Sequence, residues 1–471
     1  MLFPIVTAPY ISRVLGVENV GVVRFVMTYV SLFALFAAFG ISTHGLREIA
    51  KYKDSQKKCS KIFSSLLVIL FCSTLVVVTF FLLSINLFPE FSEHRLLFII
   101  YGLTIYFTPI TMDWYFQAKE NFRIITIRSF VVKLLALISL FIFVRERNDV
   151  MPYVLILAFS VVATHVWNLS YAFRTGLRIN FRNLEVIPHL KPMSVFLCST
   201  VAISVYVIID VIMLGHLSSF VQVGYYTAAN SVLDAIVSGC IAINMALFPR
   251  ITFNNEHKDE TTNRSLLQKN FDICALFAVP MVIGIFLISP RFVPLFFGNE
   301  FIGSIIPMKI LSLKILIWTF NSFFVYNILL VNGHEKKFFL VTVCTAILSF
   351  FFNFLLIPRY GAIGAAIVTI AIVGCFQLGF NLYYVYKLTQ TRLSLIAIKI
   401  AFLFSLPFFA IYYLCNTFIV HNIMFLFSFA FVSVIIYCAL QFAAKNYLIL
   451  QIVNIALNKL YIKNSNKLNK Q

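Results

Sequence analysis

Long apolar stretches recur along the whole chain and are separated by short polar segments. A helix needs about 20 mostly apolar residues to cross the hydrocarbon core of a bilayer, and most of these stretches reach that length. The strict alternation of apolar and polar positions that is typical of a transmembrane β-barrel is absent. The pattern therefore predicts an all-α, polytopic membrane protein with about fourteen transmembrane helices.

The expected spans fall into two groups of six, followed by two more. The first group is a short segment over 1–11 and spans near 21–41, 62–88, 96–114, 130–144 and 152–173. The second group lies near 195–214, 229–248, 271–288, 308–331, 338–357 and 363–386, and the last two spans lie near 395–417 and 422–443. The segment over 1–11 would reach only about 16 Å as a helix, so the first helix is expected to be incomplete, with an N-terminal segment missing.

Short motifs repeat between the two groups. Leu-Gly at 15–16 followed by Val-Gly at 20–21 resembles the same pairs at 214–215 and 223–224. Parallel repeats of this kind build transporters in which two helical bundles rock about a central site. The predicted domains are an N-terminal six-helix bundle over 1–190, a C-terminal six-helix bundle over 191–390, two additional transmembrane helices over 391–444 and a basic cytoplasmic tail over 445–471.

Composition and charge support this topology. The chain is 61% hydrophobic and 12% charged, with a net charge of +19, whereas soluble domains are about 25% charged. The basic residues lie in short loops, which argues against nucleic acid as a partner. One set of alternate loops, together with the C-terminal tail, holds 27 of the 37 Lys and Arg residues. Because positive loops face the cytoplasm, the C-terminus is expected to be cytoplasmic.

The sequence carries no signature of an enzyme or a metalloprotein. Eight of the nine cysteines lie inside apolar stretches without CxxC spacing, so neither a zinc site nor a disulfide framework is indicated. The chain has no nucleotide-binding loop and no HExxH motif. The stretches between spans are too short for a catalytic domain. We therefore expect a transporter without cofactors or bound metal.

Ionisable residues inside spans are costly in lipid and usually line cavities, so they are the candidate site residues. Arg24, Asp210, Asp234 and Lys314 are expected at similar depth, where they could share one aqueous cavity. Asp113 lies near the other end of its span, and Arg47 lies where the second span leaves the membrane. The short side chains of Asp210 and Asp234 cannot reach far toward water, so each must find a water molecule, a cation partner or a proton.

Several motifs resemble a known family. PYISRVLGVENVG at 9–21 and NFLLIPRYGAIGAA at 353–366 are similar to the polysaccharide flippases of the multidrug/oligosaccharidyl-lipid/polysaccharide exporter superfamily, in particular the O-antigen (Wzx-type) flippases. Asp210 before Leu-Gly at 214–215, and GLREIAK at 45–51, also look like family segments. The resemblance covers most of residues 1–390, and the last two spans match only by count.

This resemblance implies a fold, a substrate and partners. The fold would be MATE-like, with two six-helix bundles around a central cavity. The substrate would be an undecaprenyl-diphosphate-linked oligosaccharide moved from the inner to the outer leaflet of the bacterial inner membrane. Arg24, Arg47 and Lys314 are the candidates to hold the diphosphate, and Asp210, Asp234 or Asp113 would couple an ion gradient. Membrane lipids, a polysaccharide polymerase and a chain-length regulator are the expected partners.

Two other functions fit the sequence less well. A multidrug or cation exporter of the same superfamily would need an acidic cavity, and Asp113 is the one intramembrane acid expected in the N-terminal group. A non-transporting scaffold for glycan assembly would have no obvious use for buried ionisable residues.

Overall fold

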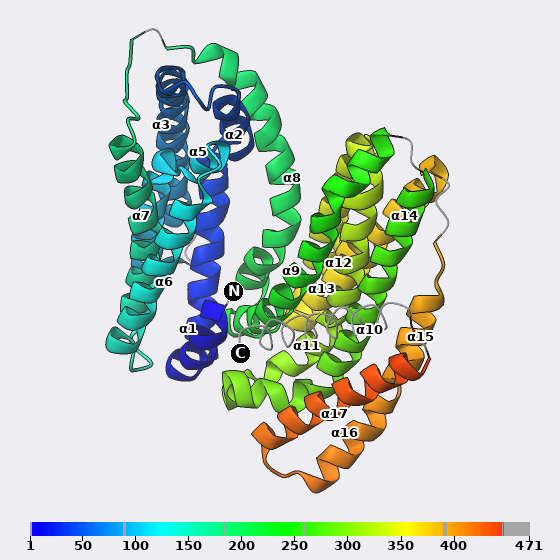
Figure 1. Ribbon diagram of the computed structural model, residues 1–471. Helices are drawn as coiled ribbons and strands as arrows, with labels where there is room; N and C mark the ends of the chain where they lie inside the picture. Colours follow the sequence, from blue (N-terminus) through cyan, green and yellow to red (C-terminus); the bar gives the residue numbers. More distant parts are fainter. Residues whose placement is uncertain are drawn as a thin grey trace, which may run out of the picture. The chain divides into compact units, whose positions relative to one another are not determined.

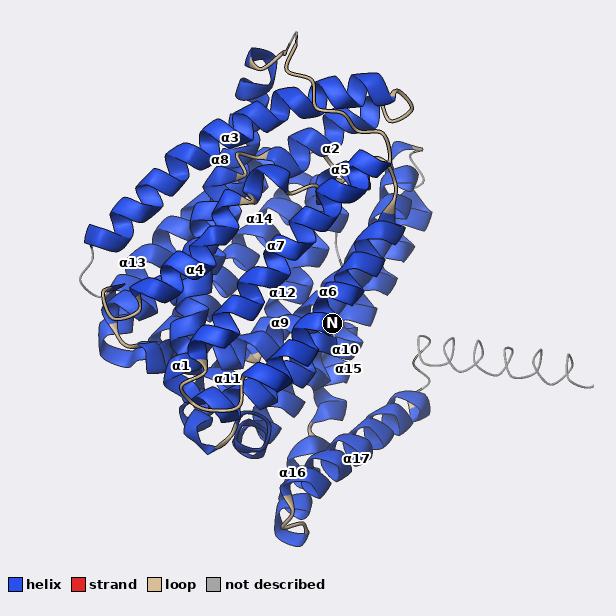
Figure 2. Cartoon of the chain, turned by 90° about the vertical axis from the view of Figure 1, so that its left-hand side faces the viewer, coloured by secondary structure: helices blue, strands red, loops and turns tan. Residues whose placement is uncertain are grey.

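A computed structural model describes residues 2–87, 91–182, 184–257, 260–389, 393–444 and 446. Every regular element within these residues is helical, and Figure 2 shows helices joined by short loops. Eleven stretches of the described residues are long and apolar enough to cross a membrane. The chain is therefore a multi-pass membrane protein with an all-α fold, as predicted. The predicted tail over 445–471 lies outside the described residues, apart from residue 446.

The helices follow the predicted spans closely. In the first half they are α1 (Leu2–Ala37), α2 (Ile41–Lys51), α3 (Gln56–Leu87), α4 (Arg95–Tyr106), η2 (Thr108–Ile110), α5 (Asp113–Ala118), α6 (Phe122–Phe143) and α7 (Val150–Arg174). In the middle they are α8 (Ile187–Leu217), α9 (Phe220–Glu256), α10 (Glu260–Phe297), η3 (Asn299–Ser304), α11 (Ile305–Leu311), α12 (Leu313–Phe324) and η4 (Val325–Leu330). The last are α13 (Glu335–Val368), η5 (Thr369–Phe376), α14 (Gln377–Thr389), α15 (Ile396–Ser405), α16 (Pro407–Phe418) and α17 (Asn422–Ala443).

Two glycines break helices where the sequence predicts separate spans. Gly16 has φ 75° inside α1, and Gly361 has φ 53° inside α13. Glycine adopts this left-handed region without the steric cost that a Cβ atom brings. At the second break, the side chain of Gln222 accepts a hydrogen bond from the backbone N–H of Ala362 at 2.9 Å. Each break changes the direction of the chain without a loop.

The amphipathic helix α2 lies outside the predicted spans. Its buried residues recur at helical spacing and are Ile41, His44, Gly45 and Ile49. A Cβ atom on Gly45 would lie 2.6 Å from the ring of Trp114, so the helix packs very closely on α5. The sequence indicated a charged loop here. It is a helix instead, because one apolar face can be buried even when the opposite face is charged.

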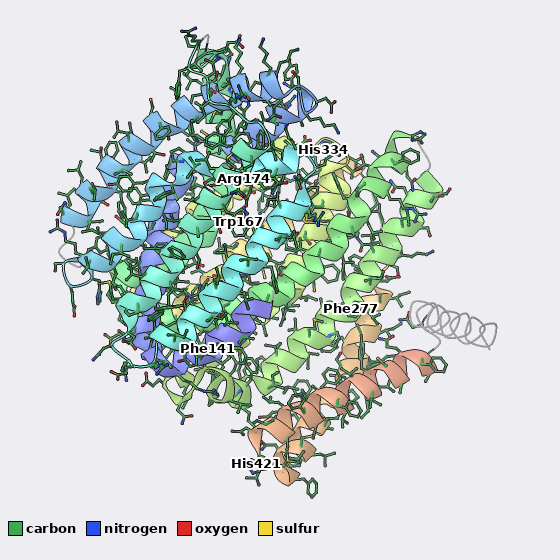
Figure 3. All side chains as sticks on the ribbon, turned by 60° about the vertical axis from the view of Figure 1, so that its left-hand side comes forward. Phe141, Trp167, Arg174, Phe277, His334 and His421 are labelled. Carbon is green, nitrogen blue, oxygen red and sulfur yellow. The ribbon has the colours of Figure 1, made fainter. Side chains whose placement is uncertain are left out.

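The chain divides into two compact units. Unit 1 comprises residues 1–228 and 342–368, and unit 2 comprises residues 229–341 and 369–471. In unit 1, α6 and α7 pack side by side in opposite directions, so Phe141 and Arg174 lie at opposite ends of that unit (Figure 3). In unit 2, α10 packs against α12, α15, α16 and α17. The predicted domain boundaries at 190 and 390 stay a prediction.

Candidate functional site

Lys314 and Asp234 form an ion pair within unit 2. The ammonium of Lys314, on α12, contacts Oδ1 of Asp234, on α9, and donates to Oδ1 of Asn230 at 2.8 Å. The Lys314 side chain is 10% exposed, whereas that of Asp234 is 51% exposed. A buried cation thus has a half-exposed counter-ion, which neutralises it in a region where an isolated charge would be costly.

Helical spacing positions the partners of this pair. Asn230 and Asp234 are four residues apart on α9, so they lie on one face, and Nδ2 of Asn230 donates to Oδ2 of Asp234 at 2.8 Å. Trp318 is four residues from Lys314 on α12, and its ring centroid lies 5.3 Å from the ammonium. The carboxylate, the amide and the ring together stabilise the cation. An anionic ligand at Lys314 would have to compete with Asp234.

Asp210 is buried in unit 1. Its exposed fraction is 2%. Oδ2 accepts a hydrogen bond from the hydroxyl of Tyr226, on α9, at 2.7 Å. Oδ1 accepts another from Nδ2 of Asn353, on α13, at 2.6 Å. Both oxygen atoms of this buried carboxyl group thus accept a hydrogen bond.

A stripe of polar residues on α13 leads to this carboxylate. The residues recur every three or four positions and are all fully buried: Thr342, Thr345, Ser349 and Asn353. Nδ2 of Asn353 also donates to the hydroxyl of Ser349 at 3.3 Å. Oδ1 of Asn353 is buried and has no hydrogen-bond partner. A carboxylate, a hydroxyl and an unpaired amide oxygen lie together here. Oxygen atoms of these kinds coordinate metal cations, and a carboxylate can also bind a proton.

Asp113 is paired with Arg128 in unit 1. Nη1 of Arg128, on α6, donates to Oδ1 of Asp113 at 2.6 Å and to Oδ1 of Asn168, on α7, at 2.6 Å. Nδ2 of Asn168 completes the triangle by donating to Asp113 at 2.8 Å. The predicted span near 130–144 begins after Arg128, whereas α6 begins at Phe122 and buries this side chain.

Arg24 and Arg47 lack carboxylate partners. Among the described residues, neither side chain forms an ion pair. Arg24, on α1, is partly buried and lies within electrostatic range of Tyr101 and Tyr153. Arg47 is exposed on α2, outside the candidate spans. Arg24 is thus a cation inside a span that remains available to an anion.

The structure brings together some of the predicted site residues. Asp234 and Lys314 meet within unit 2, whereas Arg24 and Asp210 belong to unit 1. A cavity shared by all four stays a prediction. Five residues that contact the predicted carboxylates were not predicted from the sequence: Asn230, Tyr226, Asn353, Arg128 and Asn168. The four-residue spacings on α9 and the polar period on α13 are the signals that could have indicated Asn230 and Asn353.

The described residues contain no group of three or more His, Cys, Asp or Glu side chains that could hold a metal ion. All nine cysteines are free thiols. The candidate chemistry of the described residues therefore rests on ion pairs and amide networks inside helical spans. The helical fold and these intramembrane charges are typical of transporters.

Comparison with solved structures identifies the fold. The chain superimposes with a TM-score of 0.71 on a lipid II flippase MurJ in an inward closed conformation, at 15% identity, over 94% of this chain and 99% of that one. It superimposes with a TM-score of 0.64 on an inward-facing multidrug resistance MATE family transporter of the MOP superfamily, at 14% identity, over 86% of this chain and 93% of that one. The predicted MATE-like fold is confirmed.

Sequence comparison gives the family. The family model described as "Polysaccharide biosynthesis protein" matches residues 1–255. A protein of Escherichia coli strain K12 named "Putative O-antigen transporter" is 26% identical over 374 residues, which cover 79% of this chain and 89% of that protein. The chain belongs to the polysaccharide biosynthesis protein family. The E. coli protein is named as a transporter, and the two solved structures carry the names of a flippase and a transporter.

Proposed function

We propose that the chain flips an undecaprenyl-diphosphate-linked oligosaccharide from the inner to the outer leaflet of the bacterial inner membrane. The observation that carries this proposal is family membership over residues 1–255 together with a fold that matches a lipid II flippase over 94% of the chain. The O-antigen transporter of E. coli supports a surface polysaccharide repeat unit as the substrate. The charged loops and the C-terminus would face the cytoplasm.

Arg24 and Arg47 of unit 1, and Lys314 of unit 2, would each contact the diphosphate at a separate stage of its path. Arg24 has no carboxylate partner among the described residues and lies inside a span. A guanidinium can bind two phosphate oxygens at once. Lys314 would exchange its contact with Asp234 for a contact with phosphate. Arg47, exposed on α2, would meet the substrate as it enters. The phosphate of the substrate would replace the carboxylate of Asp234, so the buried ammonium of Lys314 would always have a counter-charge.

Asp210 would carry the coupling ion. The charges of Asp234 and Asp113 are already neutralised by Lys314 and Arg128. Asp210 lies beside Oδ1 of Asn353 and the hydroxyl of Ser349, a set of oxygen atoms that suits a proton or a small cation. Binding of the ion would alternate with binding of the substrate during alternating access.

A multidrug exporter is the second candidate, because the fold also matches a multidrug transporter. Cationic drugs need an acidic cavity. Asp113 is the intramembrane acid on which this function would depend in the N-terminal group, and it already holds Arg128. This pairing favours the flippase.

The proposed function predicts a specific phenotype. Deletion of the gene is expected to abolish the surface glycan and to accumulate lipid-linked repeat units on the inner leaflet, and this chain is expected to rescue both defects. Surface glycan is measured by gel electrophoresis of extracted polysaccharide, and the leaflet by accessibility of the repeat unit to an external glycosidase. A normal surface glycan in a clean deletion with no redundant transporter would contradict the proposal, as would raised drug accumulation as the sole effect of the deletion.

Asp210→Asn is expected to slow flipping about tenfold or more, because an amide keeps the shape but cannot carry the charge that balances a bound ion. Flipping is measured in proteoliposomes with and without an ion gradient. Asp54→Asn, at an exposed position on a loop, is the matched control and should flip at the wild-type rate. Full activity of Asp210→Asn at matched expression would remove Asp210 from the coupling residues.

A further inference from the structure

Two buried histidines meet where α8 begins. His44 of α2 and His189 of α8 are 3% and 9% exposed, and Nε2 of His44 lies 2.9 Å from Nδ1 of His189. The two rings pack edge to face. At this distance one ring donates an N–H and the other accepts it, so at least one of the two facing nitrogens carries no proton. Both residues lie outside the candidate spans.

The segment before His189 is attached to α3. This strap, residues 177–186, joins α7 to α8, and residue 183 lies outside the described residues. Backbone N–H groups of the strap donate to serine hydroxyls of α3 in three pairs: Arg178 to Ser60 at 3.1 Å, Asn180 to Ser64 at 2.9 Å and Glu185 to Ser65 at 3.0 Å. Lys61 of α3 forms an ion pair with Glu185. The strap therefore fixes the chain up to the first turn of α8.

The start of α8 also packs on the corner between α1 and α2. A Cβ atom on Gly40 would lie 2.5 Å from the carbonyl oxygen of Met193 and 2.8 Å from the amide nitrogen of Leu197. Figure 1 shows α2 at the end of unit 1 where α8 begins. Backbone atoms at such short distances cannot shift by small steps without a clash or a gap. The start of α8 is therefore either docked on this corner or separated from it.

Charged groups surround the histidine pair on α2, on the strap and on α3. Glu48, Arg47 and Lys51 belong to α2, and Lys61 of α3 holds Glu185 of the strap. Burial is the main cause that lowers the pKa of both histidines, and His189 lowers the pKa of His44 further. Glu48 raises both pKa values in part, and Glu185 raises that of His189.

We propose that the His44–His189 contact is an acid-sensitive clasp, which releases the strap and the start of α8 when both rings are protonated. Two imidazolium rings present N–H donors to each other with no acceptor between them, and they carry like charges. The hydrogen bond at 2.9 Å then becomes a repulsion. α8 carries Asp210, so release would act on the helix that holds the candidate coupling acid.

The direction of the pH effect follows from the lowered pKa values. Above the ordinary histidine pKa of about 6.5, both rings are neutral whether docked or released, and the clasp is closed. As the pH falls below that value, released histidines take up protons that the docked pair resists. The equilibrium constant for docking therefore falls by up to about tenfold per pH unit for each proton that the released state takes up. This fall continues until the pH passes the lowered pKa values.

Hydrogen exchange of the full-length chain in lipid nanodiscs tests the clasp. Protection of the strap amides is compared at about pH 7.5 and about pH 5.5, each corrected for intrinsic exchange. We expect acid to lower the protection of residues 177–186 at least about tenfold, while the core of α7 keeps its protection. Unchanged protection of the strap in the wild-type protein would overturn the proposal.

Variants separate the clasp from general acid sensitivity. The glutamines of H44Q/H189Q can still donate and accept a hydrogen bond but do not titrate, so the acid response of the strap should disappear. H421Q, at the residue that precedes α17 in unit 2, is the matched control and should respond like the wild type. If the double variant does not fold, H189Q alone is expected to weaken the response, because it removes one of the two titrating rings and with it the repulsion between them. A wild-type response in H189Q or in the double variant would refute the clasp.

Discussion

Replacing Lys314 by glutamine is expected to reduce flipping of the lipid-linked substrate about 10- to 100-fold. The ammonium would supply a charge-assisted hydrogen bond to the diphosphate, and such a bond contributes about 1.5–3 kcal/mol. The fold should survive, because Asp234 is 51% exposed and keeps its hydrogen bond from Asn230. The rate is measured in proteoliposomes at matched protein content, with Lys309→Gln on α11 as the control. The ammonium of Lys309 faces the ring of Phe286 and should not matter.

A second variant distinguishes substrate binding from simple charge balance. If Lys314 served only to neutralise Asp234, the double variant Asp234→Asn/Lys314→Gln would restore flipping by removing both charges. Under the proposed function it stays inactive, because the phosphate still lacks its cation. Recovery of the double variant to near the wild-type rate would therefore exclude Lys314 from the substrate site. A rate of Lys314→Gln within about twofold of the wild type would do the same.

Asp113→Ala is expected to lower the free energy of unfolding by about 1–3 kcal/mol. The substitution leaves the guanidinium of Arg128, which is 3% exposed, with Asn168 as its remaining partner across the bundle. The cost is below that of breaking a fully buried pair, because the Asp113 side chain is 42% exposed and water already screens its charge. Unfolding is followed in mixed micelles by titration with a denaturing detergent. Asp113→Ala/Arg128→Met should recover part of the loss, because an apolar pair needs no counter-ion.

The control for this prediction is an exposed ion pair in the same unit. Glu120 pairs with Lys53 at 3.0 Å, but their side chains are 71% and 44% exposed. Water and salt already screen such charges, so Glu120→Ala should leave the unfolding midpoint unchanged. A similar loss for Glu120→Ala and Asp113→Ala would show that the buried pair has no special role in stability.

The length of the apolar stretches predicted the spans well, because the thickness of the bilayer sets helix length directly. The same reasoning missed α2, whose apolar face comprises only a few residues on one side of a charged helix. It also placed Arg128 in a loop, since basic residues near a span end usually belong to loops. The position of Arg128 depends on Asp113 and Asn168, which lie on two other helices.

Depth along a span is easier to predict than the neighbour of a helix. Asp234 and Lys314 were expected at similar depth because each helical residue rises by about 1.5 Å. Their direct contact depends on how α9 and α12 pack, which one sequence does not reveal. Asn353 shows the same limit. Its period on α13 is visible in the sequence, but its contact with Asp210 is not.

The 143 positions between Asp210 and Asn353 have a consequence for how the protein is made. A ribosome that adds about 5–20 residues per second needs about 7–30 s to cover this distance. During that time Asp210 has already entered the insertion machinery, and the amide that will hold it has not been synthesised. The nascent helix must therefore shield a carboxyl group by a proton, by water or by the insertion channel itself, and the N-terminal unit matures only after α13 arrives.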